Sequence, residues 1–101
     1  MYQDSFNAFL RSGDTLQVYE GERLVFSSEK DRLLPLMEYI GQSAVSPREV
    51  VIFDKITGNA AALLSVKAGG RQVFSPMGSQ LAVETLDKHG VKHHLTEIVP
   101  Y

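Results

Sequence analysis

The stretch that constrains this chain most is an apolar strand followed directly by a polar turn and a helix of small residues. Residues 50–53 read Val-Val-Ile-Phe, residues 54–59 form the turn, and an alanine-rich segment runs on to Gly69. A strand this apolar is typical of the middle of an α/β sheet that is covered on both faces. In such sheets ligands collect at the carboxyl ends of strands, beside helix starts whose backbone N–H groups lack intrahelical partners. The sequence therefore predicts where a site lies before it indicates any chemistry.

Length, charge and cysteine content exclude several classes of protein. The 101 residues fit a single domain, 1–101. Lys and Arg number 10 against 12 Asp and Glu, and both signs are scattered, so we expect no nucleic-acid partner. The chain has no cysteine, which excludes disulfides, thiol nucleophiles and thiolate metal sites. Its apolar runs are short and no secretory signal is visible, so we expect a cytoplasmic protein with no membrane partner.

Hydrophobic periodicity and turn signals predict four helices and five strands. In order, we expect a short helix around 6–10, a β-hairpin of strands 15–19 and 23–27, a helix over 33–42, a strand over 50–53, a helix from 58 or 59 to about 68, a short strand over 71–75, a helix from about 79 to 89, and a strand over 91–99. Single helices separate the last three strands, so those strands should run parallel. The predicted fold class is α/β, a three-layer α-β-α sandwich around a five-stranded mixed sheet.

Two helices and two loops carry more detailed expectations. We expect the helix over 33–42 to bury a stripe made of Leu33, Leu34, Leu36, Met37 and Ile40, with Pro35 in its first turn. In the later helix we expect Leu81, Ala82, Thr85 and Leu86 to point inward. Residues 41–47 and 75–79 are predicted loops, the second with Ser75 or Ser79 as a helix cap.

The order of elements resembles the cytidine deaminase-like fold, in which an antiparallel hairpin precedes parallel crossovers. More closely, the chain resembles the uncharacterised bacterial family catalogued as domain of unknown function 1893. Three segments carry this resemblance: GERLVFSSEKDRLLPLMEYI, FDKITGNAAALLSVKAGGRQVFSPM and AVETLDKHGVKHHLTEIVPY. The most specific piece is the pattern Asp-Lys-x-x-Gly-x-Ala-Ala-Ala over 54–62. The resemblance implies a deaminase-like fold. Members of the family commonly continue beyond this region with a tail that contains Asn-Arg and Cys.

The resemblance does not bring zinc-dependent deamination with it. Working deaminases open the helix after the hairpin with a metal-binding His or Cys, and the helix after the next strand with Pro-Cys-x-x-Cys. By element order these motifs fall at 28–32 and 56–61, and neither segment contains a thiol or an imidazole. Hydrolytic deamination needs a metal ion to generate hydroxide near neutral pH. We therefore expect no zinc, no other cofactor and no zinc-dependent catalytic residue.

The turn over 54–59 is the first candidate ligand-binding segment. Gly58 lets the backbone approach a ligand closely, and the N–H groups from Asn59 onward favour an anionic group. Lys55 adds positive charge, Thr57 adds a hydroxyl, and Asp54 can accept from a ribose hydroxyl or a base amino group. The alternative is that Asp54, Thr57 or Asn59 merely caps the helix while Lys55 is solvated.

The second candidate segment is the helix start at 28–32. Ser28, Lys30 and Arg32 should face the same crevice as the first segment, which suits a phosphate or carboxylate. The alternative is a surface cap with solvated charges. The three histidines do not favour a metal site, because His93 and His94 are neighbours on a strand and point to opposite faces.

Three functions remain open at this point. The first is a binding module for a small anionic or nucleotide-like ligand at the paired helix N-termini. The second is a homo-oligomeric interaction domain, a homodimer for example, with the last strand as its edge. The third is a divergent enzyme without a metal, using Asp54 as base and Lys55 as electrostatic stabiliser.

Overall fold

The computed structural model describes residues 2–42 and 49–100, which form an α/β fold with four helices and a five-stranded mixed sheet. In chain order the elements are α1 (Gln3–Arg11), β1 (Leu16–Glu20), β2 (Arg23–Ser28), α2 (Leu34–Gln42), β3 (Val50–Asp54), α3 (Asn59–Lys67), β4 (Gly70–Ser79), α4 (Gln80–Lys88) and β5 (Lys92–Val99). This order confirms the predicted sequence of helices and strands. Of the predicted loop at 41–47, positions 41 and 42 belong to α2 and positions 43–47 lie outside the described residues.

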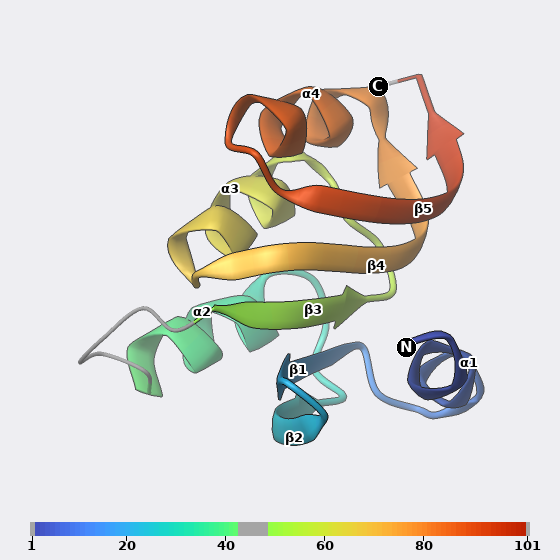
Figure 1. Cartoon of the computed structure of the whole chain (residues 1–101), viewed down its shortest axis with the longest axis vertical. Coiled ribbons are helices and arrows are strands. Elements are labelled where there is room, and N and C mark those ends of the chain that lie inside the picture. The colour runs from blue at the N-terminus through green and yellow to red at the C-terminus, as the bar shows by residue number, and fades with distance from the viewer. Residues whose placement is uncertain (1, 43–48, 101) are drawn as a thin grey trace.

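The sheet has the strand order β2-β1-β3-β4-β5, with β3 at its centre (Figure 1). β1 pairs antiparallel with both β2 and β3, whereas β3, β4 and β5 run parallel. All five residues of β3 are buried, as its apolar sequence predicts for a central strand. The hairpin turn between β1 and β2 uses Gly21 at a φ of 59°, a left-handed conformation that glycine adopts without strain.

Alternation along β3 assigns its side chains to two separate cores. Val50 and Ile52 point to the face where they pack with residues of α2, α3 and α4. Val51 and Phe53 point to the other face, where Phe9 of α1 lies among aromatic rings. Helix α1 is thus set apart from the other three helices, as Figure 1 shows.

Strand β4 is longer than the sequence indicates. It runs over ten residues to Ser79, so the loop predicted after position 75 is wrong. The extension forms because Met77 and Ser79 stay paired with β5, while Thr57 forms a bridge to Gly78 on the other side. Pro76 and Gly78 read as loop residues in isolation, and only these long-range partners hold them in a strand.

The predicted inward stripe of α2 is partly wrong. The side chains of Leu34 and Met37 are exposed, while Leu36 and Tyr39 are buried. The ring of Tyr39 packs against Phe26 of β2 at 5.5 Å between centroids, which sets the inward face of the helix. Pro35 lies in the first turn of α2, as predicted.

The predicted inward face of α4 is also wider than the observed one. Ala82 and Leu86 are buried as predicted, but Leu81 is exposed.

Over residues 2–42 and 49–100, no helix has both the length and the apolar character needed to cross a membrane.

Candidate functional site

The carboxyl end of β3 is where the predicted site residues begin. Asp54 is the last residue of β3 and lies opposite Leu16 of β1. Ser28, the last residue of β2, lies opposite the same Leu16 on the other side of β1. Because directly opposite residues share a face, Asp54 and Ser28 point to the same side of the sheet, at the same end. That side is the one that α2, α3 and α4 cover.

Asp54 is an unusual carboxyl group for a neutral solution. Its exposed fraction is 7%, and this burial raises the pKa of Asp54 to about 7. The backbone N–H groups of Ile56 and Lys55 oppose the change, because they donate to the carboxylate and lower the pKa. Asp54 therefore exchanges a proton near neutral pH, which an exposed aspartate does not do.

A short ladder of backbone hydrogen bonds connects the two predicted segments. The Thr15 N–H donates to the Ser28 carbonyl at 2.8 Å, and the Lys55 N–H donates to the Thr15 carbonyl at 3.1 Å. The Thr15 hydroxyl also donates to the carbonyls of Ser28 and Lys30. The structure thus brings segments 28–32 and 54–59 to one end of the sheet, with Thr15 between them. Thr15 is absent from the predicted site residues, since only the pairing register reveals its position.

The predicted cationic side chains do not come together. The Lys55 ammonium donates to the Ser12 carbonyl at 3.1 Å and lies 4.9 Å from the centre of the Phe9 ring, on the α1 side of the sheet. The Lys30 ammonium forms an ion pair with Glu38 at 2.6 Å. Arg32 is exposed and has a φ of 60°, a conformation uncommon outside glycine.

Helix α3 begins without a side-chain cap. Its N-cap residue is Gly58, with a φ of −83° and a ψ of −179°, and among the residues that the structure describes no side-chain hydrogen bond caps the helix. A Cβ atom built on Gly58 would meet nothing within 4 Å. The alternative prediction, that Asp54, Thr57 or Asn59 caps this helix, does not match the described geometry. The space beside the Cα atom of Gly58, at the start of α3, is therefore open.

The two remaining predicted site residues of the turn, Thr57 and Asn59, hold it in place. Thr57 is fully buried, its N–H donates to the Met77 carbonyl at 2.9 Å, and its carbonyl accepts from the Ser79 N–H at 3.1 Å. The Asn59 amide oxygen accepts from the Thr85 hydroxyl, which ties α3 to α4. Within the described chain the Thr57 hydroxyl makes no hydrogen bond. Thr57 and Asn59 thus position the open helix start at Gly58.

The neighbouring strand end carries two serines with structural partners. The fully buried Ser75 donates its hydroxyl to the Met77 carbonyl at 2.8 Å. The Ser79 hydroxyl accepts from the Ala82 N–H at 3.0 Å and so caps α4. This confirms the prediction of a serine cap in this stretch.

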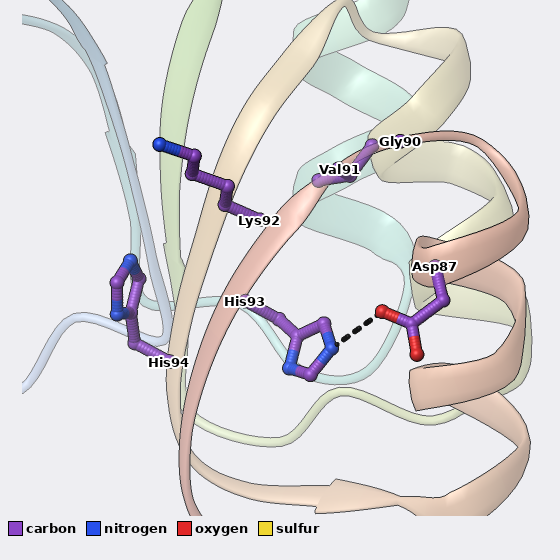
Figure 2. Close-up of a pocket in the computed structure, with 6 residues that line it drawn as sticks. All are labelled: Asp87, Gly90, Val91, Lys92, His93 and His94. Carbon is purple, nitrogen blue, oxygen red and sulfur yellow. Dashed lines mark hydrogen bonds and ion pairs between the residues drawn. The ribbon is translucent and has the colours of Figure 1, made fainter.

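A hollow of about 350 Å³ lies at the opposite end of the sheet, where β5 begins (Figure 2). It is lined by Asp87, Gly90, Val91, Lys92, His93 and His94. His93 points toward α4, and its Nε2 forms a hydrogen bond with Oδ1 of Asp87 at 2.9 Å (Figure 2). His94 points to the other side of the sheet, as predicted (Figure 2). His94 stacks on Phe74 at 4.1 Å, and burial, followed by the charges of His93 and Lys92, lowers its pKa. Among the residues placed by the structure, no group of three or more His, Asp or Glu side chains could hold a metal ion.

Comparison with known proteins identifies the family and its fold. The model of a family described as a domain of unknown function (DUF1893) matches residues 5–101. No curated protein matches the chain. A crystal structure of a DUF1893 family protein from Thermotoga maritima superimposes with a TM-score of 0.82 at 22% sequence identity. The match covers 98% of this chain and 66% of that one, so this chain spans less than two thirds of the solved protein. At this identity the solved structure shows the fold alone, and the family match shows that the chain belongs to the DUF1893 family.

Proposed function

We propose that this DUF1893 domain is a binding module for a small anionic or nucleotide-like ligand at the carboxyl end of the sheet. The observation that carries the proposal is the open start of α3 at Gly58, where no side chain caps the helix and a Cβ atom would have no neighbour within 4 Å. The amides of a first helical turn have no intrahelical acceptors, and the helix dipole favours a negative group beside them. An anionic group of a ligand fits this position.

Asp54 supplies the second contact in this proposal. It lies at the same end of the sheet as the start of α3 and on the face that α3 covers. Its carboxyl group can accept a hydrogen bond from a hydroxyl or amino group when ionised, and can donate one when protonated. A nucleotide-like ligand offers both kinds of group at a distance from its phosphate. The ligand would then have its phosphate at Gly58 and its sugar or base toward Asp54.

The lysine side chains contribute less to binding the anion in this proposal than the sequence indicates. Lys55 and Lys30 already have protein partners in Ser12 and Glu38. In the proposal, backbone amides of α3 therefore make the main contact with the anion. Ser28, the last residue of β2, and Arg32, in the segment before α2, are secondary contacts.

The test is a thermal-shift and calorimetric screen with inorganic phosphate, nucleosides and nucleoside monophosphates. We expect a nucleoside monophosphate to raise the melting temperature, because a ligand that binds only the folded state stabilises it. Gly58→Val should abolish the rise by filling the space beside the α3 amides. Gly41→Val is the matched control, since position 41 lies near the end of α2 and is equally open. Unchanged melting temperatures across the whole panel would refute the proposal.

A divergent enzyme without a metal is the second candidate function. The observation that favours it is the pKa of about 7 at Asp54, which suits a general acid or base near neutral pH. Lys55 points toward α1 and does not support the predicted role of electrostatic stabiliser. Turnover of a nucleotide that is lost in Asp54→Asn, with the fold intact, would support this function. Turnover that persists in Asp54→Asn would exclude Asp54 as the base.

We further propose that the fold is a three-layer sandwich of the cytidine deaminase-like type. Helices on both sheet faces support the layers, and the antiparallel hairpin followed by parallel crossovers supports the type. The positions where deaminases carry zinc ligands, 28–32 and 56–61, hold no thiol or imidazole in this chain. The proposed relationship is therefore one of fold and site location, without zinc-dependent chemistry.

A further inference from the structure

Strand β5 forms one edge of the sheet and offers a long, regular pairing surface. It follows β4 at the end of the strand order and spans eight residues. Figure 1 shows β5 as the outermost strand, which bends together with β4 toward its carboxyl end. From Lys92 to Val99 it keeps one register with β4. Its residues are exposed or half-buried, and Ile98 has an exposed fraction of 49%. A regular edge strand is a template on which another strand can pair.

The opposite edge of the sheet is less suited to such pairing. There β2 spans six residues, and its pairing with β1 shifts register between Val18 and Tyr19. Such a bulge bends the strand and disrupts the row of outward-facing backbone groups. Of the two edges of the described sheet, β5 is therefore the one that pairs with its neighbour in a single register.

Symmetry restricts how two copies of β5 can pair. In an antiparallel pair related by a two-fold axis, opposite residues lie on the same face of the joined sheet. Because faces alternate along a strand, the axis must then pass beside a residue and not between two residues. Centres at positions 94, 95, 96 and 97 give most of the strand a partner.

Charge complementarity selects one of these centres. A centre at Leu95 places His93 opposite Glu97 of the second copy, twice by symmetry, and Lys92 opposite Ile98. A centre at position 97 places Glu97 opposite itself, which is unfavourable for like charges, and a centre at position 94 places Glu97 opposite Val91 and pairs no opposite charges. A centre at position 96 places Glu97 opposite the apolar Leu95. The Leu95 centre is the register of these four that pairs an acidic with a basic side chain. In this register Glu97 of the second copy joins Asp87 of the same chain as a carboxylate neighbour of His93, which lies 2.9 Å from Asp87.

We propose that two copies of this chain pair antiparallel through β5, about a two-fold axis at Leu95, and join their sheets into one. The juxtaposition that carries the proposal is His93 and Glu97 on one face and Lys92 and Ile98 on the other, at matching distances from Leu95. The proposal is independent of the ligand site, which lies at the carboxyl end of β3. It assigns the edge to a second copy because β5 is complementary to itself in this register.

The first experiment measures oligomeric state by light scattering and sedimentation of the full chain over a wide concentration range. We expect a reversible monomer–dimer equilibrium. Hydrogen exchange on the unmodified chain gives a second measurement, in which β5 amides should become more protected as the protein concentration rises. A monomer at every concentration, or protection of β5 that does not depend on concentration, would overturn the proposal.

The second experiment tests the edge and the register. Ile98→Lys places a second ammonium group opposite Lys92 of the other copy, in two symmetric pairs, so dimerisation should weaken roughly tenfold. Leu24→Lys is the matched control on β2, where Leu24 has an exposed fraction of 45%, and should leave dimerisation unchanged. The double variant Lys92→Glu with Ile98→Lys should restore the dimer, because the charges become opposite. An equal effect of Leu24→Lys, or no restoration in the double variant, would overturn the proposed pairing.

Discussion

At the scale of single residues, Asp54 belongs both to the buried central strand of the sheet and to the candidate site. The central strand must be buried to hold the sheet together, and its last residue is a carboxyl group with an exposed fraction of only 7%. Burial disfavours the charged form, so the folded protein binds a proton at Asp54 more tightly than the unfolded chain does. A buried carboxyl group lowers the free energy of unfolding when it ionises. A protein with an aspartate at this position is therefore less stable at neutral pH than it would be with an uncharged side chain there.

We predict that Asp54 makes the protein less stable as the pH rises from about 4 to about 7. Folding raises the pKa of Asp54 from 3.8 to about 7. The folded state therefore gains stability from the bound proton, in full below pH 3.8, and loses this gain as the pH rises to about 7. A change of that size corresponds to roughly 4 kcal/mol as an upper bound. Urea unfolding across this pH range should show the slope, and Asp54→Asn should flatten it. Asp31→Asn, at an exposed carboxyl group, is the control; an unchanged slope in Asp54→Asn would contradict the prediction.

At the scale of elements, α3 and α4 start at the same end of the sheet but in different ways. Ser79 caps α4 through its hydroxyl, whereas Gly58 leaves α3 without a side-chain cap. The φ of −83° at Gly58 is one that any residue can adopt, so backbone conformation does not require a glycine there. Open space beside uncapped amides is what the binding proposal needs, and it has a cost in helix stability.

We predict opposite changes in stability from substitutions at these two caps. Ser79→Ala should lower the free energy of unfolding by about 1 kcal/mol, because the Ala82 N–H loses its acceptor. Gly58→Ser should raise it by a few tenths of a kcal/mol, since a serine there can cap α3 in open space. Thermal and urea unfolding measure both values. A Gly58→Ser variant that is less stable than the unmodified protein would show that the glycine has a packing role.

The order of the elements could be predicted from the sequence because periodicity and turn residues are local signals. The extension of β4 to Ser79 could not, because Pro76 and Gly78 are held there by pairing with β5 and Thr57. For the candidate site, the sequence predicted that segments 28–32 and 54–59 lie at one end of the sheet, since the carboxyl ends of strands follow from topology; their role in binding stays a prediction. It did not predict that Lys55 turns toward α1, because that direction depends on contacts with Ser12 and Phe9.

At the scale of the whole molecule, the sheet separates two cores that differ in composition. The core under α2, α3 and α4 is built mainly from aliphatic residues, while α1 covers an aromatic cluster. In that cluster the fully buried Phe9 lies 5.7 Å from Phe53 and 6.1 Å from Phe6, between ring centroids. One nine-residue helix thus closes one face of the sheet, and its hold depends on few side chains.

We therefore predict that Phe9→Ala is among the most destabilising substitutions in the chain. Truncating a fully buried phenylalanine removes its contacts and leaves a cavity, which costs about 3–5 kcal/mol. It also removes the ring beneath the Lys55 ammonium, so the β3–α3 turn should loosen with α1. Leu10→Ala, at the next position and 40% exposed, should change the free energy of unfolding by less than about 0.5 kcal/mol. Urea unfolding separates the two variants, and hydrogen exchange of the amides of Lys55 and Ile56 tests the link. If those amides keep their protection in Phe9→Ala, α1 does not hold the turn, and the proposed ligand site is independent of this face of the sheet.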